Sequence, residues 1–477
     1  MNAPTQTDPD PLPKSGRSSL LDAPEHVLST LEQDGSRRWL YPKLSKGRLW
    51  KWRRALAYFL IAFFVVLPHL RTGGKPVILL DIVRRKFVFF GHTFLPTDSL
   101  LLALLMVGVF VTIVLATAFF GRVWCGWACP QTVYMEFLFR PIDRLFEGTA
   151  GKGGKPKRKP TGWLALARYA VYLVLAMILA HTFLAYFVGT DALAQWVRSS
   201  PTEHPVAFLV MAVTTGAMLF HFLFFREQLC LIACPYGRFQ SVMLDRQSLI
   251  VAYDTNRGEP RKKGRHLEGE DVGDCVDCNQ CVVVCPTGID IRNGLQLECV
   301  NCAQCIDACN NVMDRVGKPQ GLIRYSSQDA LSGKPPKWLR VRTVAYPLLL
   351  TGIVVAFLVV LSTKFAFDAR VMRGRGNPFE QVSAGVITNN FLLRLRNRTD
   401  EERTYNIEVL EPSQAELADE ESETVTLPSI GNKLFPLVVR VPATQIGITG
   451  KTRGKVRITD DIGNERIVTM NIFGPSR

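Results

Sequence analysis

The sequence of 477 residues lacks several features, and each absence argues against a class of protein. No Gly-x-Gly-x-x-Gly motif stands between an expected strand and an expected helix, so we predict no dinucleotide-binding domain. The chain is basic, with a formal net charge of +15, but it has no zinc-finger spacing or recognition helix that would favour nucleic acid. The first forty residues are polar throughout, so we expect no cleavable signal peptide. No cysteine follows Cys309, so no disulfide joins two parts of the C-terminal region.

Long apolar runs are the most prominent feature that is present. A helix needs about 20 consecutive apolar residues to cross a membrane. Five runs approach or reach this length: Lys51–Leu70, Leu100–Phe120, Trp163–Val188, Val206–Phe225 and Val341–Thr363. The first run has the shortest apolar core, because Trp50, Trp52, Arg53 and Arg54 would have to lie at the membrane interface. We therefore predict an α-helical membrane bundle of about five spans.

The distribution of Lys and Arg predicts how these helices are oriented, because cytoplasmic loops carry an excess of both residues. Basic residues are concentrated between the second and third runs, after the fourth run and just before the fifth. We expect these segments on the cytoplasmic side of the inner membrane, with the N-terminus inside and the C-terminus in the periplasm. Arg84, Arg85 and Lys86 argue against this orientation, but the majority of the basic residues favours it. The basic linker Gly148–Pro160 is expected to lie against anionic lipid headgroups.

Eight of the twelve cysteines stand between Asp274 and Asn311, in a spacing that occurs twice. The first copy is Cys275-x2-Cys278-x2-Cys281-x3-Cys285-Pro, and the second is Cys299-x2-Cys302-x2-Cys305-x3-Cys309-Asn. In two-cluster bacterial ferredoxins this spacing holds two 4Fe–4S clusters, each with three cysteines of one copy and the fourth of the other. We therefore assign Cys275, Cys278, Cys281 and Cys309 to cluster 1, and Cys299, Cys302, Cys305 and Cys285 to cluster 2. Structural zinc is disfavoured, because zinc modules pair their C-x2-C units across longer gaps. Asn310 departs from the pattern, in which a proline is expected.

The other four cysteines form a second repeat. GRVWCGWACP closes the second apolar run with Cys125 and Cys129, and REQLCLIACP closes the fourth with Cys230 and Cys234. If each helix continued, both thiols of a motif would face the same way, and the following proline would end or kink the helix. Four thiols that meet at the cytoplasmic face would suit Cu(I), zinc or a further iron–sulfur centre. Buried structural thiols and a dithiol relay are the alternatives.

Histidines and methionines in the apolar runs are weaker candidates. His69, His181 and His221 fall within three of the runs, and two histidines on different helices could ligate haem. His221, together with Met211 and Met218, could line a path for copper toward Cys230. Residues of these types more often pack against neighbouring helices or face lipid.

These motifs divide the chain into five expected parts, of mixed fold class. Residues 1–49 are expected to be a flexible cytoplasmic segment, and 50–250 a four-helix membrane domain with both Cys-x-x-x-Cys-Pro motifs. Residues 251–340 are expected to form a cytoplasmic two-cluster ferredoxin-like domain, followed by a fifth transmembrane helix at 341–365. Residues 377–477 contain segments such as RTYNIEVLEP and KVRITDD, in which apolar and polar residues alternate. This pattern predicts a periplasmic all-β, immunoglobulin-like sandwich.

The order of these parts resembles the FixG/RdxA/CcoG family of cytochrome c oxidase accessory proteins. The resemblance begins near Trp39-Leu40-Tyr41-Pro42 and extends to the C-terminus. It implies a membrane protein that reduces Cu(II) to Cu(I) in biogenesis of the cbb-type oxidase, with Cys125, Cys129, Cys230 and Cys234 as the copper-handling thiols. The implied partners are the lipid bilayer, an electron donor, and an oxidase subunit or copper chaperone.

Two other functions fit the same residues. One is a quinol-linked polyferredoxin that conducts electrons, and the other is an oxidase assembly scaffold whose clusters sense redox state. The outer β domain favours the cupric reductase over the quinol-linked conduit, because a simple conduit has no evident need for such a domain. The sequence leaves open whether the chain is an enzyme, in this case a cupric reductase, and whether it forms a homodimer.

Overall fold

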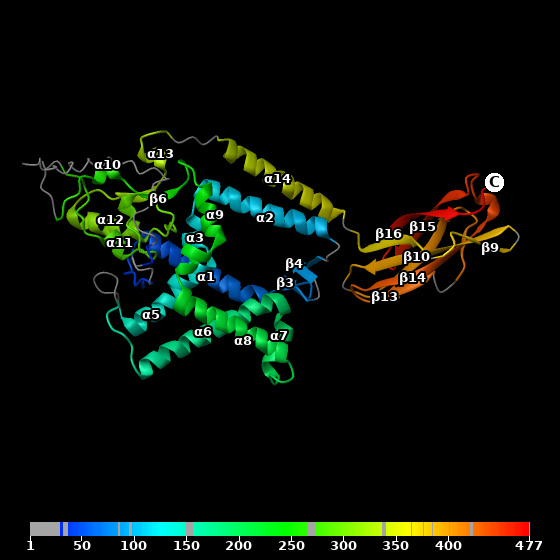
Figure 1. The fold of residues 1–477 in the computed structure, drawn as a ribbon, viewed down its shortest axis with the longest axis horizontal. Helices are drawn as coiled ribbons and strands as arrows, with labels where there is room; N and C mark the ends of the chain where they lie inside the picture. The colour runs from blue at the N-terminus through cyan, green and yellow to red at the C-terminus, as the bar shows by residue number, and fades with distance from the viewer. Residues whose placement is uncertain are drawn as a thin grey trace, which may run out of the picture. The chain divides into compact units, whose positions relative to one another are not determined.

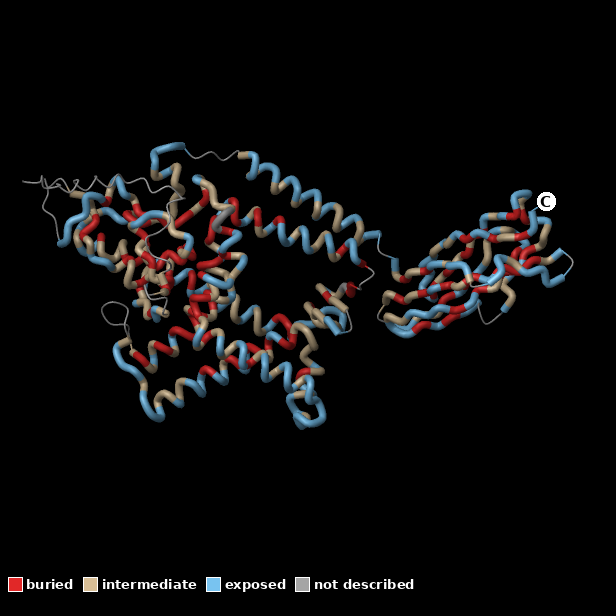
Figure 2. Tube along the Cα trace, viewed as in Figure 1, coloured by how far each residue is buried: buried red, intermediate tan, exposed pale blue. Residues whose placement is uncertain are grey.

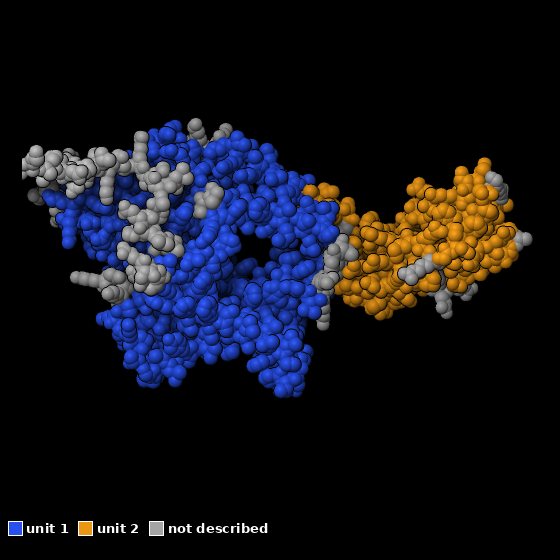
Figure 3. Space-filling model, viewed as in Figure 1, with its two compact units in different colours: residues 1–355 blue, residues 356–477 orange. Residues whose placement is uncertain are grey.

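The computed structural model describes most of the chain. The described residues are 29–31, 37–83, 86–94, 98–148, 156–264, 272–335, 340–363, 365–374, 376–383, 385–399, 401–419 and 423–476. The chain divides into two units, Met1–Val355 and Ala356–Arg477 (Figure 3).

Four helices among the described residues are long and apolar enough to cross a membrane. They are α2 (Ser99–Phe120), α6 (Trp163–Val188), α8 (Pro205–Phe220) with its extension η4 (His221–Phe225), and α14 (Val341–Ser362). Most of their surface is exposed in the protein (Figure 2), as expected of helices that contact lipid. The chain is therefore a membrane protein.

The first predicted span is the exception. It forms α1 (Arg48–Val66), which is long enough to cross a membrane but carries too many charged residues to be a candidate span. Its first two turns carry Arg48, Lys51, Arg53 and Arg54. Arg53 is only 1% exposed whereas Lys51 and Arg54 are exposed, so one face of this end of α1 packs against protein. The number of predicted spans is corrected from five to four on this evidence.

Short helices and strands connect the long helices of the first unit (Figure 1). The Cys-x-x-x-Cys-Pro motifs lie in α3 (Val123–Trp127) and α4 (Pro130–Tyr134), and in η5 (Leu229–Ala233) and α9 (Pro235–Met243). The first motif continues into η2 (Met135–Phe139) and α5 (Arg140–Glu147), and α7 (Thr190–Arg198) follows α6. Between α1 and α2, β3 (Ile78–Asp81) pairs antiparallel with β4 (Lys86–Phe89). The short strands around it are β1 (Arg71–Thr72), β2 (Lys75–Pro76) and β5 (His92–Phe94).

The eight-cysteine region is closed by a two-stranded sheet. Strand β6 (Ile250–Tyr253) pairs antiparallel with β7 (Ile323–Ser326). Between them lie α10 (Thr255–Gly258), α11 (Gln280–Val283), η6 (Ile291–Asn293) and α12 (Gln304–Val316), and α13 (Gln328–Leu331) follows. The apolar residues packed around the cysteines include Val251, Ile306, Met313 and Leu322. We call the segment from Ile250 to Ser326 the ferredoxin domain.

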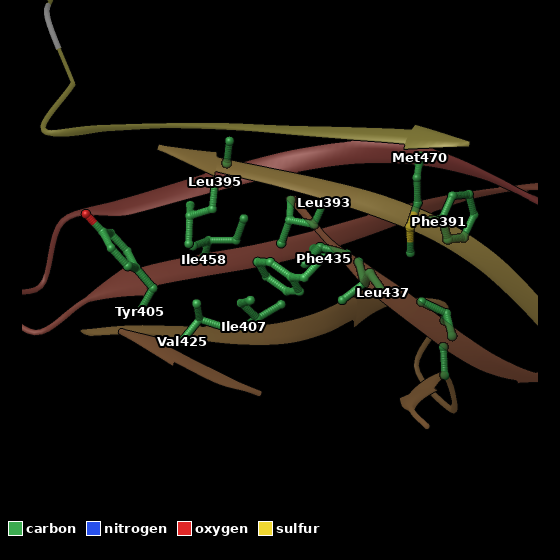
Figure 4. Packing of buried hydrophobic residues seen from close by; sticks show 14 of the residues in the cluster. Phe391, Leu393, Leu395, Tyr405, Ile407, Val425, Phe435, Leu437, Ile458 and Met470 are labelled. Atoms are coloured by element: carbon green, nitrogen blue, oxygen red, sulfur yellow. The ribbon is translucent and has the colours of Figure 1, made fainter. Parts of the chain in front are cut away.

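The second unit is a sandwich of two antiparallel sheets. One sheet has the order β12 (Glu416–Leu417), β14 (Asn432–Pro442), β10 (Val386–Asn397) and β8 (Phe367–Arg373), with β9 (Glu380–Ser383) also paired to β10. The other has the order β13 (Thr424–Leu427), β11 (Arg403–Glu411), β15 (Lys451–Asp460) and β16 (Glu465–Phe473). Alternate residues of β10, such as Leu393 and Leu395, point into the core between the sheets (Figure 4). The sandwich begins at Phe367, earlier than the predicted Asn377.

Candidate iron–sulfur and thiol sites

The eight cysteines of the ferredoxin domain line two adjoining cavities. Cys275, Cys278, Cys281 and Cys309 line the first, which we call the cluster-1 cavity; it encloses about 340 Å³, partly open to solvent. Cys285, Cys299, Cys302 and Cys305 line the cluster-2 cavity, which encloses about 330 Å³. Cys281 lines both cavities, so they lie next to each other. With the shared Cys281 counted in the cluster-1 cavity, each cavity has three thiols of one copy of the spacing and one of the other, as two 4Fe–4S clusters require.

The two copies also share an unusual backbone conformation. Asp277 and Asn279, on either side of Cys278, have φ angles of 47° and 56°. Asn301 and Ala303, on either side of Cys302, have φ angles of 54° and 61°. Left-handed residues turn the chain sharply, so each loop can wrap around a cluster-sized object. This agreement shows that the spacing repeat is also a repeat of structure.

Asn310 marks where the second copy differs. It lies inside α12, which continues without a break from Gln304 to Val316. Its side-chain oxygen accepts a hydrogen bond of 3.0 Å from the amide of Gly321. A proline at this position would interrupt the helix, so the absence of the expected proline fits the longer helix.

The Cys-x-x-x-Cys-Pro motifs are not single helices. Cys129 has φ −60° and ψ 126°, and Cys234 has φ −73° and ψ 108°, so both have extended backbone. Pro130 and Pro235 each begin a new helix instead of ending one. The helix therefore does not continue through either motif, so the condition that would place both thiols on one helix face is not met.

A matching turn precedes each motif. Gly121 has φ 57° and ψ −128°, and Arg226 has φ 48° and ψ −124°. Each stands four residues before the first cysteine of its motif. Glycine tolerates this conformation, whereas an arginine must be held in it. The two hairpins are thus repeats of one backbone design.

A glutamine that follows each motif binds the turn that precedes the other motif. Gln240 of α9 donates a hydrogen bond of 2.9 Å to the carbonyl of Gly121, and Gln131 of α4 donates one of 2.8 Å to the carbonyl of Arg226. Gln240 also accepts a hydrogen bond from the thiol of Cys125 at 3.1 Å. Each motif therefore fixes the turn that precedes the other, and the two motifs face each other.

Burial raises the pKa of Cys125, Cys129 and Cys230. It raises the pKa of Cys125 to about 11 and that of Cys230 to about 12. Cys125, Cys129 and Cys234 raise the pKa of Cys230 further, so the four thiols lie within electrostatic reach of one another. Across the described residues, no three or more His, Cys, Asp or Glu side chains are grouped closely enough to hold a single metal ion.

The first motif packs directly against the cluster-2 cavity. Cys125 forms one apolar cluster with Val300 and Cys302, and Tyr236 packs on it. A Cβ atom added to Gly126 would lie 2.5 Å from the carbonyl oxygen of Val300, so only glycine permits this approach. No pattern in the sequence indicates this contact, because Gly126 and Val300 belong to segments that lie far apart in the chain.

A hydrogen-bonded chain reinforces the same junction. The indole of Trp127 donates to the hydroxyl of Tyr325 at 2.8 Å, and that hydroxyl donates to the carbonyl of Asn301 at 2.8 Å. Asn301 and Cys302 are neighbours in the chain. The Cys-x-x-x-Cys-Pro repeat and the ferredoxin domain are therefore joined by both apolar and polar contacts.

The hydrogen bonds and packing contacts of the histidine and methionine candidates are made with residues other than the four thiols. His221 forms a hydrogen bond with Gln131, and His181 forms one of 2.7 Å with the carbonyl of Met177. Met211 accepts a hydrogen bond from Thr215, and Met218 packs in the apolar core around Phe139. His69 is exposed at the end of the short helix η1 (Leu67–His69).

Comparison with family models agrees with this division of the chain. A model described as a 4Fe-4S dicluster domain matches residues 225–328, and one described as a 4Fe-4S binding domain matches 102–149. A third, described as the IG-like fold at the C-terminus of FixG, matches 357–474. The protein is therefore an iron–sulfur protein, and the expected immunoglobulin-like domain is confirmed.

Three known proteins are similar over most of the chain. RdxB of Cereibacter sphaeroides is 35% identical over 80% of this chain and 83% of its own length. RdxA of the same organism is 34% identical over 85% of this chain and 90% of its own length. The nitrogen fixation protein FixG of Rhizobium meliloti is 30% identical over 78% of this chain and 79% of its own length. The chain therefore belongs to the FixG/RdxA family of membrane-bound iron–sulfur electron-transfer proteins.

Proposed function

We propose that this protein reduces Cu(II) to Cu(I) for the biogenesis of a cbb-type cytochrome c oxidase. The observation that carries the proposal is the packing of Cys125 against Val300 and Cys302. Val300 and Cys302 both line the cluster-2 cavity, so one thiol of the motif pair packs against the wall of a cavity lined by iron–sulfur ligand candidates. Electrons stored in the ferredoxin domain would then lie next to a soft sulfur site, which is the kind of site that prefers Cu(I).

The cavity linings support one allotment of ligands. Cys275, Cys278, Cys281 and Cys309 would hold cluster 1, and Cys285, Cys299, Cys302 and Cys305 would hold cluster 2. When bound, the clusters supply one-electron storage at low potential. The surrounding residues exclude water and fix the distance to the thiols, chiefly through Gly126 and the Trp127–Tyr325 hydrogen bond.

The motif thiols would bind copper with fewer than three of them at a time, in keeping with their spacing in the described residues, and would favour its reduced form. One Cu(II) ion accepts one electron and becomes Cu(I), and one cluster is oxidised by one electron, so the electrons balance. A one-electron donor protein or a membrane quinol would restore the reduced state. An oxidase subunit or a copper chaperone would receive the Cu(I) ion.

We place the ferredoxin domain and both motifs on the cytoplasmic side and the β sandwich in the periplasm. Contacts put the start of α1, the end of α2 and the ferredoxin domain at one face, since Asp307 binds the first turn of α1 and Gly126 adjoins Val300. Arg340, just before α14, pairs with Asp245 at 2.7 Å. The basic segments at this face support its cytoplasmic assignment.

A double substitution tests the role of the thiols. Cys230→Ser with Cys234→Ser should leave both clusters intact and abolish cupric reduction by the dithionite-reduced protein. Ala233→Ser is the matched control, because it adds a hydroxyl inside the second motif and keeps all four thiols. Full activity in a double variant with normal iron content would remove the thiols from the proposal.

A second function for the four thiols is favoured by one observation. The match to a 4Fe-4S binding domain at residues 102–149 includes Cys125 and Cys129. The thiols would then hold a further iron–sulfur centre. Iron analysis separates the two proposals: two clusters give about eight iron atoms per chain and three give about twelve. A value near twelve that falls to eight in the double variant would favour the further centre.

A further inference from the structure

Two buried arginines stand between the motif pair and the cluster-2 cavity. Arg53 of α1 is 1% exposed, and its Nε donates a hydrogen bond of 2.9 Å to the carbonyl of Gly126. Arg122, 4% exposed, donates from Nη1 to the carbonyl of Leu297, just before Cys299. Both guanidinium groups thus lie at the junction where α3 meets the ferredoxin domain.

Neither arginine has a carboxylate partner within the described part of the chain. Nη2 of Arg53 and Nε of Arg122 are also buried there without a hydrogen-bond acceptor. A buried and unpaired guanidinium is costly. The cost falls if a negatively charged group occupies the neighbouring cavity, and a 4Fe–4S cluster held by four thiolates is such a group.

The arginines beside the cluster-1 cavity are, by contrast, neutralised. Arg292 lines that cavity and forms ion pairs of 2.6 Å with both Asp277 and Asp290. Arg257 forms an ion pair of 2.5 Å with Asp274. The two cavities are therefore similar in their cysteines and different in the net charge around them.

We propose that the unpaired charges of Arg53 and Arg122 give cluster 2 a higher reduction potential than cluster 1. This inference rests on the proposed ligand allotment. Reduction adds one negative charge to a cluster, and an uncompensated cation nearby stabilises the reduced form. Electrons then enter beside Cys278, which is exposed, and leave beside Cys302, which is buried against Cys125.

Hydrogen bonds hold each guanidinium group near the cluster-2 cavity. Arg53 binds the carbonyl of Gly126, which lies against Val300 of the cavity wall, and Arg122 binds the carbonyl of Leu297, two residues before Cys299. A positive charge held at this distance stabilises the extra negative charge of a reduced cluster.

Redox titration followed by electron paramagnetic resonance tests the inference on the full-length, cluster-loaded protein. Arg53→Gln and Arg122→Gln should each lower the higher of the two midpoint potentials and leave the lower one in place. Arg53→Lys keeps the charge and should keep the wild-type value. Arg292→Gln leaves the carboxylates of Asp277 and Asp290 unpaired beside the cluster-1 cavity. This change should therefore decrease the midpoint potential of cluster 1, the lower of the two, and leave that of cluster 2 unchanged. Arg315→Gln, an exposed change on α12, is the control and should move neither.

The outcomes are separable from those of the copper assay. If Arg53→Gln or Arg122→Gln moves the lower potential, or neither potential, in protein with normal iron content, the inference is overturned. Should Arg53→Gln yield no folded protein, Arg122→Gln and Arg53→Lys carry the same test. A protein that does not reduce copper can still show the predicted shifts, so failure of the copper proposal leaves this result readable.

Discussion

At the scale of single residues, burial sets the chemistry of the motif thiols. Burial raises the pKa of Cys125 to about 11 and of Cys230 to about 12, so both are protonated near neutral pH. A metal ligand must be a thiolate. Each thiol that binds copper therefore has to release its proton.

Cu(I) binding should accordingly weaken as the pH falls. Because the raised pKa values of Cys125 and Cys230 lie far above the pH of the measurement, protons compete with copper for these thiols at every pH tested. The expected loss is about tenfold in affinity per pH unit for each proton displaced. Anaerobic competition with a Cu(I) chelator between about pH 6 and 8 measures this slope. An affinity that does not change with pH would show that copper binds elsewhere.

Arg226 illustrates strain held in place by a buried ion pair. Its φ of 48° is unfavourable for arginine, and its guanidinium binds Asp143 at 2.6 Å. Arg226→Met should cost about 3 kcal/mol, because it removes one partner of a buried carboxylate. Arg246→Met, which breaks the exposed pair with Asp329, should cost at most about 1 kcal/mol. Thermal unfolding in detergent micelles compares the two variants, and equal losses would contradict this account.

At the scale of elements, Asp307 couples α1 to the ferredoxin domain. Its carboxylate accepts hydrogen bonds from the amides of Leu49 and Trp50 at 3.2 and 2.7 Å. These amides belong to the first turn of α1, where no side chain of α1 itself provides a cap. A Cβ on Gly47 would lie 2.2 Å from Asp307, so glycine is required for this approach.

Removing this cap should loosen α1. Asp307→Ala is expected to cost about 1–2 kcal/mol, whereas Asp307→Asn should cost less because it keeps an acceptor. Asp314→Ala serves as the control, because Asp314 is an exposed residue of the same helix as Asp307 and binds only the side chain of Gln320 among the hydrogen bonds of the described residues. Hydrogen exchange of the amides in α1 reports the effect directly. Unchanged protection of Leu49 and Trp50 in Asp307→Ala would contradict the capping role.

The turn before the second motif could not be predicted from the sequence, although the motif itself could. The repeat of the Cys-x-x-x-Cys-Pro motifs and its place at the helix ends are readable from spacing alone. The break between α8 and the second motif is not, because it occurs at Arg226, and arginine carries no preference for a left-handed turn. Gly121 at the equivalent position is the only local signal of this turn.

At the scale of the whole molecule, the second unit has its own core. Leu393, Leu395, Tyr405 and Ile458 are fully buried between its two sheets (Figure 4). The unit contains no cysteine, so its stability depends on this core. We therefore expect residues 365–477 to fold when expressed alone.

A pair of substitutions tests the core. Leu393→Ala removes a side chain with no exposed surface and should cost about 2–5 kcal/mol. Val382→Ala in β9, where the side chain is 64% exposed, should have little effect. Denaturant unfolding of the isolated unit, followed by circular dichroism, measures both. A fragment without a cooperative transition would show that the unit depends on the rest of the chain.

The order of the parts could be predicted from sequence, but their contacts could not. Apolar runs, cysteine spacing and alternating strands have periodic signatures, and these identify the membrane helices, the ferredoxin domain and the sandwich. The described part of the N-terminal segment was expected to be flexible, yet Ser29 and Lys43 bond to the ferredoxin domain. Such contacts depend on single residues that lie far apart in the chain, and no periodic pattern marks them.

The central claim is that electrons stored in the ferredoxin domain reduce copper at the four motif thiols. The most direct measurement is an anaerobic titration of the reduced protein with stoichiometric Cu(II), recording cluster paramagnetic resonance and Cu(I) formation together. The account predicts one Cu(I) ion for each electron lost from the clusters, and loss of this reaction when Cys125, Cys129, Cys230 and Cys234 are changed to serine. Clusters that stay reduced when Cu(II) is added, but that a quinol can reduce, would contradict the account and would identify an electron conduit instead.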